Sequence, residues 1–197
     1  MHLLIAGLVL FLGVHSISIV SYRWRDATAE RLGAGAWRGL YSLVSVVGLA
    51  LIVYGFGRAR FENPVILYVA PIWVRDTMIM LMAFVFPMVF AAYFPGLISA
   101  VLKHPMLVGV KLWATLHLLV NGSLADVLLF GSVLAWAVLD RISFRWRPAR
   151  PIPTAPPWKW NDAIAILLGF AVYVALVAGG HQWITGLPIP FRHARPG

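Results

Sequence analysis

Long stretches without formally charged residues constrain the fold of this chain more than any other feature. The clearest are residues 1–22, 39–57, 77–102 and 163–191, and residues 112–139 carry a single charge at Asp126. About 20 apolar residues in a helix cross the hydrocarbon core of a bilayer. Of the 197 residues, 61% are hydrophobic and only 12% are charged, which excludes an ordinary soluble domain. We therefore predict an all-α fold, a polytopic membrane helical bundle.

We predict about six transmembrane helices in a single transmembrane domain covering residues 1–197. Pro87 and Pro95 lie inside or end the third helix. In the longest apolar region, Asn121-Gly122-Ser123 is a turn signal that separates a helix over 106–120 from one over 124–139. The last helix is expected over about residues 162–184, after a Pro-rich cytoplasmic loop at residues 147–157. A five-span or re-entrant arrangement of residues 112–139 is the alternative.

Basic residues lie in the short segments between the apolar runs and predict the orientation of the chain. With six spans, the larger set falls on one side: Arg23, Arg25, Arg31, Arg38, Lys103, Arg141, Arg145, Arg147, Arg150 and Lys159. The smaller set falls on the other side: Arg58, Arg60, Arg75, Arg192 and Arg195. Because cytoplasmic loops are enriched in Lys and Arg, we expect the larger set in the cytoplasm and both termini outside.

The first apolar run is expected to be retained rather than cleaved as a signal peptide, because no Lys or Arg precedes it and a basic patch follows it. The net charge of +9 is spread over short loops and leaves no contiguous basic surface for nucleic acid. The expected partner is the lipid bilayer.

Two of the six histidines, His15 and His117, fall inside apolar runs, where polar side chains are costly and often functional. A helical rise of about 1.5 Å per residue places both at a similar depth. Two imidazoles on different helices at one depth suit the axial ligation of a haem b. The cations expected near the haem carboxylates are Arg23, Arg25, Arg38 and Lys111. Another metal, a proton relay or hydrogen bonds between helices are the alternatives.

The sequence gives little support to other kinds of catalytic or metal-binding site. The chain has no cysteine, so thiolate ligands, disulfides and cysteine nucleophiles are excluded. No Ser-His-Asp set, paired carboxylates or phosphate loop is present, so hydrolase and kinase activities are not predicted. His104 precedes Pro105 at the expected membrane surface, where it would bind a haem carboxylate or cap a helix.

Several separated motifs follow one another along the chain: Leu12-Gly13-Val14-His15-Ser16, Arg23 to Arg25, Arg38-Gly39-Leu40-Tyr41-Ser42-Leu43-Val44-Ser45, Leu102-Lys103-His104-Pro105-Met106, Lys111-Leu112-Trp113, His117-Leu118-Leu119-Val120-Asn121-Gly122 and Phe130-Gly131-Ser132. In this order they resemble the NnrU family of bacterial membrane proteins. The resemblance implies a multi-pass protein of the bacterial inner membrane. It also implies a role in nitrite and nitric oxide metabolism during denitrification, with a nitric oxide reductase system as a partner.

The NnrU family is similar to 15-cis-zeta-carotene isomerase, a membrane enzyme that binds haem b through histidines. This similarity implies that His15 and His117 are the iron ligands and that an isomerase would act on a hydrophobic polyene. The isomerase branch carries a cysteine three residues before the second histidine, linked to a redox-dependent ligand change, whereas this chain has Ala114. A haem-dependent cis-trans isomerase and a cofactor-free structural membrane partner are thus the alternatives to a haem protein of denitrification.

Overall fold

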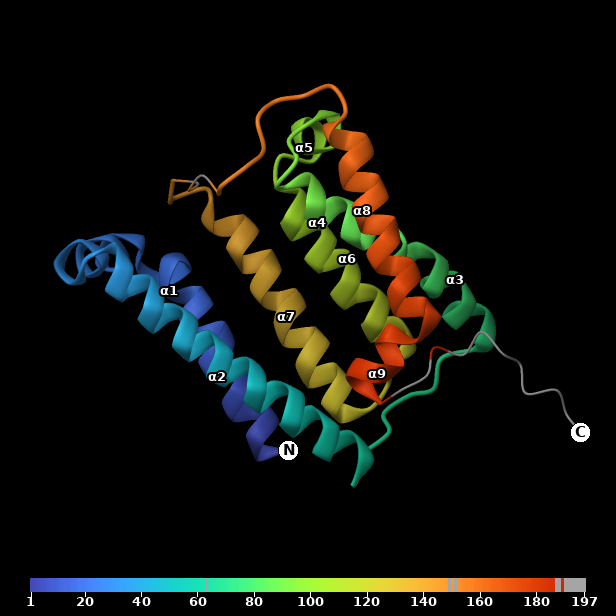
Figure 1. The fold of residues 1–197 in the computed structure, drawn as a ribbon. Helices are drawn as coiled ribbons and strands as arrows, with labels where there is room; N and C mark the ends of the chain where they lie inside the picture. The colour runs from blue at the N-terminus through green and yellow to red at the C-terminus, as the bar shows by residue number, and fades with distance from the viewer. Residues whose placement is uncertain (63, 149, 151, 187–188, 190–197) are drawn as a thin grey trace, which may run out of the picture. The chain divides into compact units, whose positions relative to one another are not determined.

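The computed structural model describes residues 1–62, 64–148, 150, 152–186 and 189 (Figure 1). The helices are α1 (His2–Leu32), α2 (Ala34–Phe61), α3 (Ile72–Met82), α4 (Val85–Ala91), α5 (Leu97–Leu102), α6 (Pro105–Val120), α7 (Leu124–Ser143), α8 (Asn161–Ala175), the wider turn η1 (Leu176–Gly180) and α9 (His181–Thr185). Over these residues, strand-like pairing is limited to a bridge between Ile66 and Ser123. The predicted all-α fold class is confirmed.

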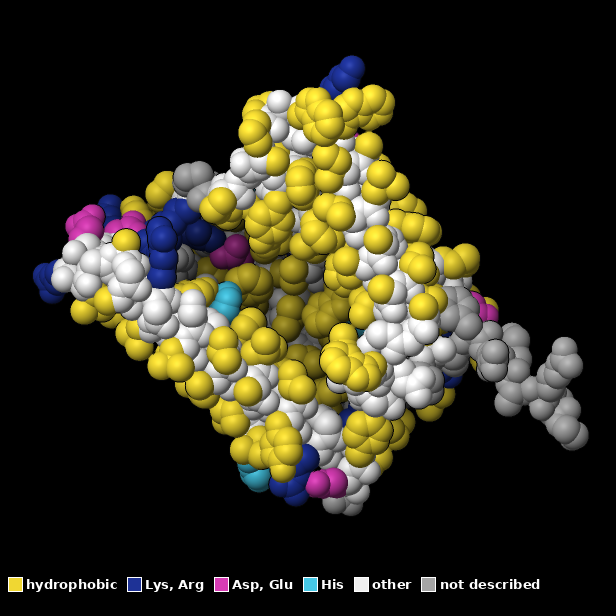
Figure 2. Space-filling model, viewed as in Figure 1, with side chains coloured by type: hydrophobic (Ala, Val, Ile, Leu, Met, Phe, Trp, Pro, Cys, Tyr) yellow, Lys and Arg dark blue, Asp and Glu magenta, His cyan; other side chains and the backbone are white. Residues whose placement is uncertain are grey.

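Four helical stretches are long and apolar enough to cross a membrane: His2–Leu32, Ala34–Phe61, Ile72–Ala91 and Asn161–Thr185. The shorter apolar helix α6 and the 20-residue α7 lie where two further spans were expected. Large hydrophobic side chains stay exposed along these helices, and they cover much of the visible face in Figure 2. Such surfaces suit lipid rather than water, and the chain is a multi-pass membrane protein.

The third predicted helix, over residues 77–102, differs from the observed one. The helical stretch begins earlier, at Ile72, and ends at Ala91, with a break between Met82 and Val85. Pro87 has no N–H to offer the carbonyl four residues before it, which favours a break in the helix at this point. A second break near Pro95 leaves α5 as a separate short helix.

The chain divides into two compact units, and each is built from two separate stretches of sequence. The first unit consists of Met1–Val69 and Asn121–Pro151 and contains α1, α2 and α7. The second unit consists of Ala70–Val120 and Ile152–Gly197 and contains α3 to α6, α8, η1 and α9.

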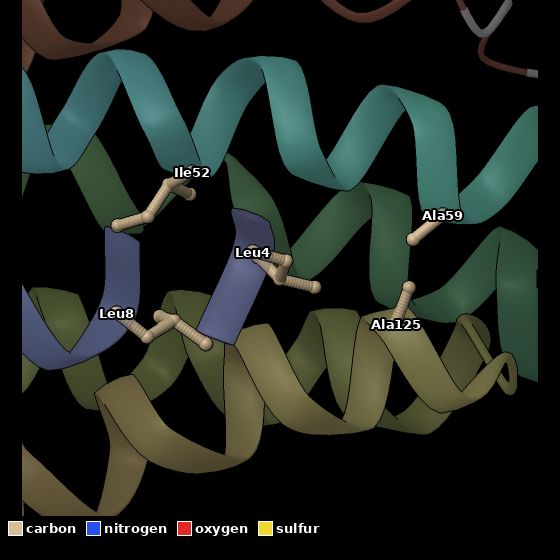
Figure 3. Close-up of a cluster of buried hydrophobic side chains, with 5 residues drawn as sticks. All are labelled: Leu4, Leu8, Ile52, Ala59 and Ala125. Carbon is tan, nitrogen blue, oxygen red and sulfur yellow. The ribbon is translucent and has the colours of Figure 1, made fainter. Parts of the chain in front are cut away.

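In the first unit, α1 and α2 run side by side and approach closely at three glycines, Gly7, Gly48 and Gly55 (Figure 1). A Cβ added at Gly48 would lie 2.8 Å from the backbone nitrogen of Phe11, and one added at Gly55 would overlap the backbone of Leu4. Small residues of this kind let membrane helices pack backbone against backbone. Five buried side chains form the hydrophobic cluster here: Leu4, Leu8, Ile52, Ala59 and Ala125 (Figure 3).

Helix α1 bends at Ser21, which has non-helical torsion angles (φ −152°, ψ 85°). The Ser21 hydroxyl accepts a hydrogen bond from the backbone N–H of Trp24 at 3.3 Å, as an N-capping serine does. The indole N–H of Trp146 donates to the carbonyl oxygen of Ile19 at 3.3 Å. These side chains satisfy backbone groups near the bend, so residues 22–32 continue as a separately capped helix.

In the second unit, the first turn of α8 holds the segment before α5. The Asn161 side-chain amide donates to the carbonyl oxygens of Pro95 (2.9 Å) and Pro156 (3.1 Å). The Asp162 carboxylate accepts from the backbone N–H groups of Leu97 (2.7 Å) and Ile98 (3.0 Å). The start of α8 thereby fixes the position of Pro95 and of the first turn of α5.

Candidate functional site

His15 lies in the interior of α1 and is surrounded by aromatic rings. Its Nδ1 is 2.6 Å from the carbonyl oxygen of Phe11, one turn earlier. The ring of Phe11 is 4.3 Å from the imidazole, and those of Tyr41 on α2 and Trp136 on α7 are 5.2 and 5.9 Å away, measured between ring centroids. Because a carbonyl oxygen only accepts hydrogen bonds, Nδ1 carries the proton, and the neutral ring then holds its lone pair on Nε2.

His117 lies in α6 and repeats this local arrangement in the second unit. Its Nδ1 donates to the carbonyl oxygen of Trp113 at 2.9 Å, and the Trp113 ring is 4.9 Å from the imidazole. In both units an aromatic residue four positions before the histidine contacts the imidazole and accepts from its Nδ1. A histidine that ligates a metal through Nε2 commonly has its Nδ1–H fixed in this way.

His15 and His117 belong to different units, so the prediction that they bind one cofactor stays a prediction. Within the described residues, no group of three or more His, Asp or Glu side chains is arranged to hold a metal ion. The iron of a haem takes only one or two axial ligands from the protein.

Trp136 provides an independent observation at His15. Its indole nitrogen is buried and has no hydrogen-bond partner among the described residues. Its ring stands at 90° to the imidazole of His15. A buried N–H without an acceptor calls for an explanation, and an additional group bound beside His15 would supply one.

The cations predicted to contact haem carboxylates are found in both units. Arg23, Arg25 and Arg38 flank the turn from α1 to α2, where Lys and Arg side chains gather in Figure 2. Arg25 is half-buried, pairs with Asp26 at 3.0 Å and lies 5.5 Å from the Trp37 ring centroid. Arg23 and Arg38 are exposed. Lys111 is half-buried on α6 in the second unit, so the described contacts do not bring it to the three arginines.

His104 stands directly before α6. Its carbonyl oxygen accepts from the backbone N–H of Val108 at 3.1 Å, as the residue preceding a helix does, and Pro105 takes the first helical position. About 20 Å of helix separates it from His117. The backbone of His104 thus serves the start of α6, and the prediction that its side chain binds a carboxylate stays open.

Several polar contacts at one end of the first unit were missed in the sequence. We name this region the basic end and define it by Ser18, Asp26, Asp140, Arg147 and Arg150. Arg147 pairs with Asp140 and donates to Ser143, while Arg150 donates to Ser18 (2.9 Å) and pairs with Asp26 (2.6 Å). The spacing of Asp140 and Arg147, two helical turns, was the available signal.

The opposite end of this unit is closed by the Asn121-Gly122-Ser123 turn. We name it the closed end and define it by Arg60, Tyr68, Gly122, Ser123 and Asp126. Asp126 is 1% exposed, pairs with Arg60 and accepts from the backbone and hydroxyl of Ser123. The Tyr68 hydroxyl donates to the carbonyl oxygen of Asn121 at 3.0 Å, and burial, followed by the charge of Asp126, raises the pKa of Tyr68. These contacts hold the end of α2 and the start of α7 together.

Comparisons with known proteins agree with the motifs around these residues. Neither the curated proteins nor the solved structures contain a match to this chain. The family model described as NnrU protein matches residues 3–189, which is nearly the entire chain. The match includes both intramembrane histidines and the turn at the closed end, and on this evidence the chain belongs to the NnrU family.

Proposed function

We propose that this protein binds haem b, with His15 and His117 as the axial ligands of the iron. The observation that carries the proposal is the repeated local arrangement of the two histidines. Each Nδ1 donates to the carbonyl oxygen of the aromatic residue four positions earlier. This orients each ring, and a histidine oriented through Nδ1 commonly binds a metal through Nε2. Hydrogen bonding for helix packing alone does not require the same tautomer at both histidines.

The residues around His15 have defined tasks in this proposal. The carbonyl of Phe11 orients the imidazole, and the rings of Phe11, Tyr41 and Trp136 pack beside it. Arg23, Arg25, Arg38 and Lys111 are the candidates to neutralise the haem carboxylates. When bound, haem supplies an iron centre that can bind nitric oxide or transfer electrons.

The proposed role follows from the family and lies in nitrite and nitric oxide metabolism at the bacterial inner membrane. A nitric oxide reductase system is the proposed partner. Isomerisation of a polyene is less well supported, because the position of the redox-linked cysteine is occupied by Ala114, which is fully buried. The ligand change attributed to that cysteine has no equivalent residue here.

Absorption spectra of the detergent-purified protein, oxidised and reduced, test the proposal. We expect a Soret band of a low-spin b-type haem, which His15→Ala and His117→Ala each shift or abolish. His181→Ala is the matched control, since His181 contacts Thr185 at the end of its own helix and should leave the spectrum unchanged. Adding nitric oxide to the reduced protein should shift the band if one ligand is displaceable.

Two results would contradict the proposal in different ways. A protein that binds no haem after reconstitution would favour the cofactor-free structural partner. Loss of haem in His104→Ala, with haem retained in His117→Ala, would show that the second ligand has been assigned to the wrong histidine. Conversion of a cis polyene by the purified protein would instead favour the isomerase.

A further inference from the structure

The indole N–H of Trp136 is a buried hydrogen-bond donor that the fold leaves without an acceptor among the described residues. Tryptophan N–H groups usually find a partner when they are buried. Trp146, in the same unit, does so by donating to the carbonyl oxygen of Ile19. An unsatisfied buried donor is costly, and the acceptor of a bound group at this position would remove the cost.

The position of Trp136 restricts what this acceptor can be. The indole ring contacts the imidazole of His15 edge to face, with 5.9 Å between the centroids. A donor that touches the axial histidine lies on the same face of the haem as that histidine. It therefore cannot reach a molecule bound to the iron on the opposite face.

Haem b carries two carboxylates at its edge, and these are its charged peripheral groups. An N–H bonded to a carboxylate forms a charge-assisted hydrogen bond, which is stronger than a neutral one. Trp136 also lies one helical turn before Asp140 of the basic end, at the end of the unit that carries Arg23, Arg25 and Arg38. Arg23, Arg25, Arg38, Arg147 and Arg150 outnumber the carboxylates Asp26 and Asp140 at this end, and the net positive charge favours an anionic group.

From these observations we infer that Trp136 is a positioning residue whose indole N–H holds a haem carboxylate and so sets the orientation of the haem beside His15. The inference rests on the proposed haem site. It assigns Trp136 no part in ligating the iron. Removing the N–H should therefore weaken haem retention without changing the axial ligands.

The experiment measures the rate at which haem leaves the purified protein and is captured by excess apomyoglobin. We compare the wild type with Trp136→Phe, and with a protein carrying 3-benzothienylalanine at position 136, which keeps the shape of tryptophan without the N–H. Each is loaded with haem b or with iron octaethylporphyrin, which has no carboxylates. Trp24→Phe, at an exposed position of the same unit, is the control.

We expect both changes at position 136 to release haem b roughly tenfold faster, in line with the loss of one charge-assisted hydrogen bond. The low-spin spectrum should be retained, and the release of iron octaethylporphyrin should be equal in all variants. Equal release of haem b from all variants would overturn the inference while leaving the haem proposal intact. Faster release of both porphyrins would also overturn it, because it would reflect ring packing. A wild type that binds no haem b would overturn the inference and the proposed function together.

Discussion

The two ends of the first unit both pair carboxylates with arginines, but they do so in different surroundings. At the closed end, Asp126 is almost fully buried and the side chain of its partner, Arg60, is 21% exposed. At the basic end, Asp26 is shared by Arg25 and Arg150, and its side chain is 40% exposed, whereas the second pair there, Asp140 with Arg147, is largely buried. The Asp126 carboxylate is enclosed by the fold, whereas that of Asp26 remains in contact with solvent.

This difference separates the charges that stabilise the fold from those that set the orientation of the chain in the membrane. A buried charge that loses its partner is strongly destabilising, whereas an exposed ion pair contributes about 0–1 kcal/mol. The basic end also carries arginines in excess of its carboxylates, as the cytoplasmic side of a membrane protein does. We therefore expect the buried pairs, Asp126 with Arg60 and Asp140 with Arg147, to govern stability, and the exposed arginines of the basic end to govern topology.

The largest expected effect is all-or-none and concerns topology. Because the chain has no cysteine, single cysteines can be placed at Glu62 beside the closed end and at Arg145 beside the basic end. In intact cells, a membrane-impermeant maleimide should label Glu62→Cys, and it should label Arg145→Cys only after lysis. Labelling of both residues from the outside would contradict the predicted orientation.

Next in size is the effect of breaking the buried ion pair. Asp126→Ala removes the partner of Arg60 and the carboxylate that accepts from Ser123, and we expect a loss of about 3 kcal/mol in the free energy of unfolding. Chemical unfolding in mixed micelles measures it. The double variant Arg60→Met with Asp126→Ala should recover part of this loss, since no charge is then left buried. A double variant less stable than Asp126→Ala would show that Arg60 does not need a partner.

A smaller effect is expected at the turn of the closed end. A Cβ at Gly122 would overlap the carbonyl oxygen of Tyr68, so Gly122→Ala must displace the neighbouring loop. We expect a loss of about 1–3 kcal/mol in the free energy of unfolding. Gly131→Ala is a matched control, because nothing lies within 4 Å of its added Cβ and alanine favours the helix. Equal effects of both substitutions would show that the turn tolerates side chains.

The smallest effect on stability is expected at the exposed ion pair of the basic end, between Arg150 and Asp26. Arg150→Ala removes the contacts to Ser18 and Asp26, and we expect a loss of about 1 kcal/mol or less, the value of an exposed pair. This loss should shrink in about 1 M salt, where charges are screened beyond roughly 3 Å. Arg145→Ala, at an exposed position, serves as the control. A salt-independent loss of several kcal/mol would show that the Arg150 pair stabilises the fold as strongly as the buried Asp126 pair.

The fold class was predictable because stretches of uncharged residues directly report the membrane. The break between α3 and α4 was harder to place, since a proline such as Pro87 can either kink a helix or end it. Asp126 was visible as a charge in an apolar run, but its partner Arg60 lies 66 residues away in the sequence. No local pattern reveals such a pair.

The candidate site was predictable to a similar extent. The positions of His15 and His117 deep within apolar runs single out both histidines in the sequence. Tyr41 and Trp136 were missed, because their relevance comes from the packing of α2 and α7 against α1. The i−4 hydrogen bonds that fix each histidine are local, and the Phe11 and Trp113 spacing could have suggested them.

The discontinuous make-up of each unit has a consequence for biosynthesis. Arg60 leaves the ribosome long before Asp126, and at about 5–20 residues per second the arginine waits several seconds for its partner. The hairpin of α1 and α2 must therefore enter the membrane with one end unfinished, and it is completed only when α7 arrives. The second unit begins in the interval, because residues 70–120 are synthesised between the two halves of the first. Insertion of this protein is thus an interleaved process, and a pause in translation before residue 126 would prolong the exposure of an unpaired charge.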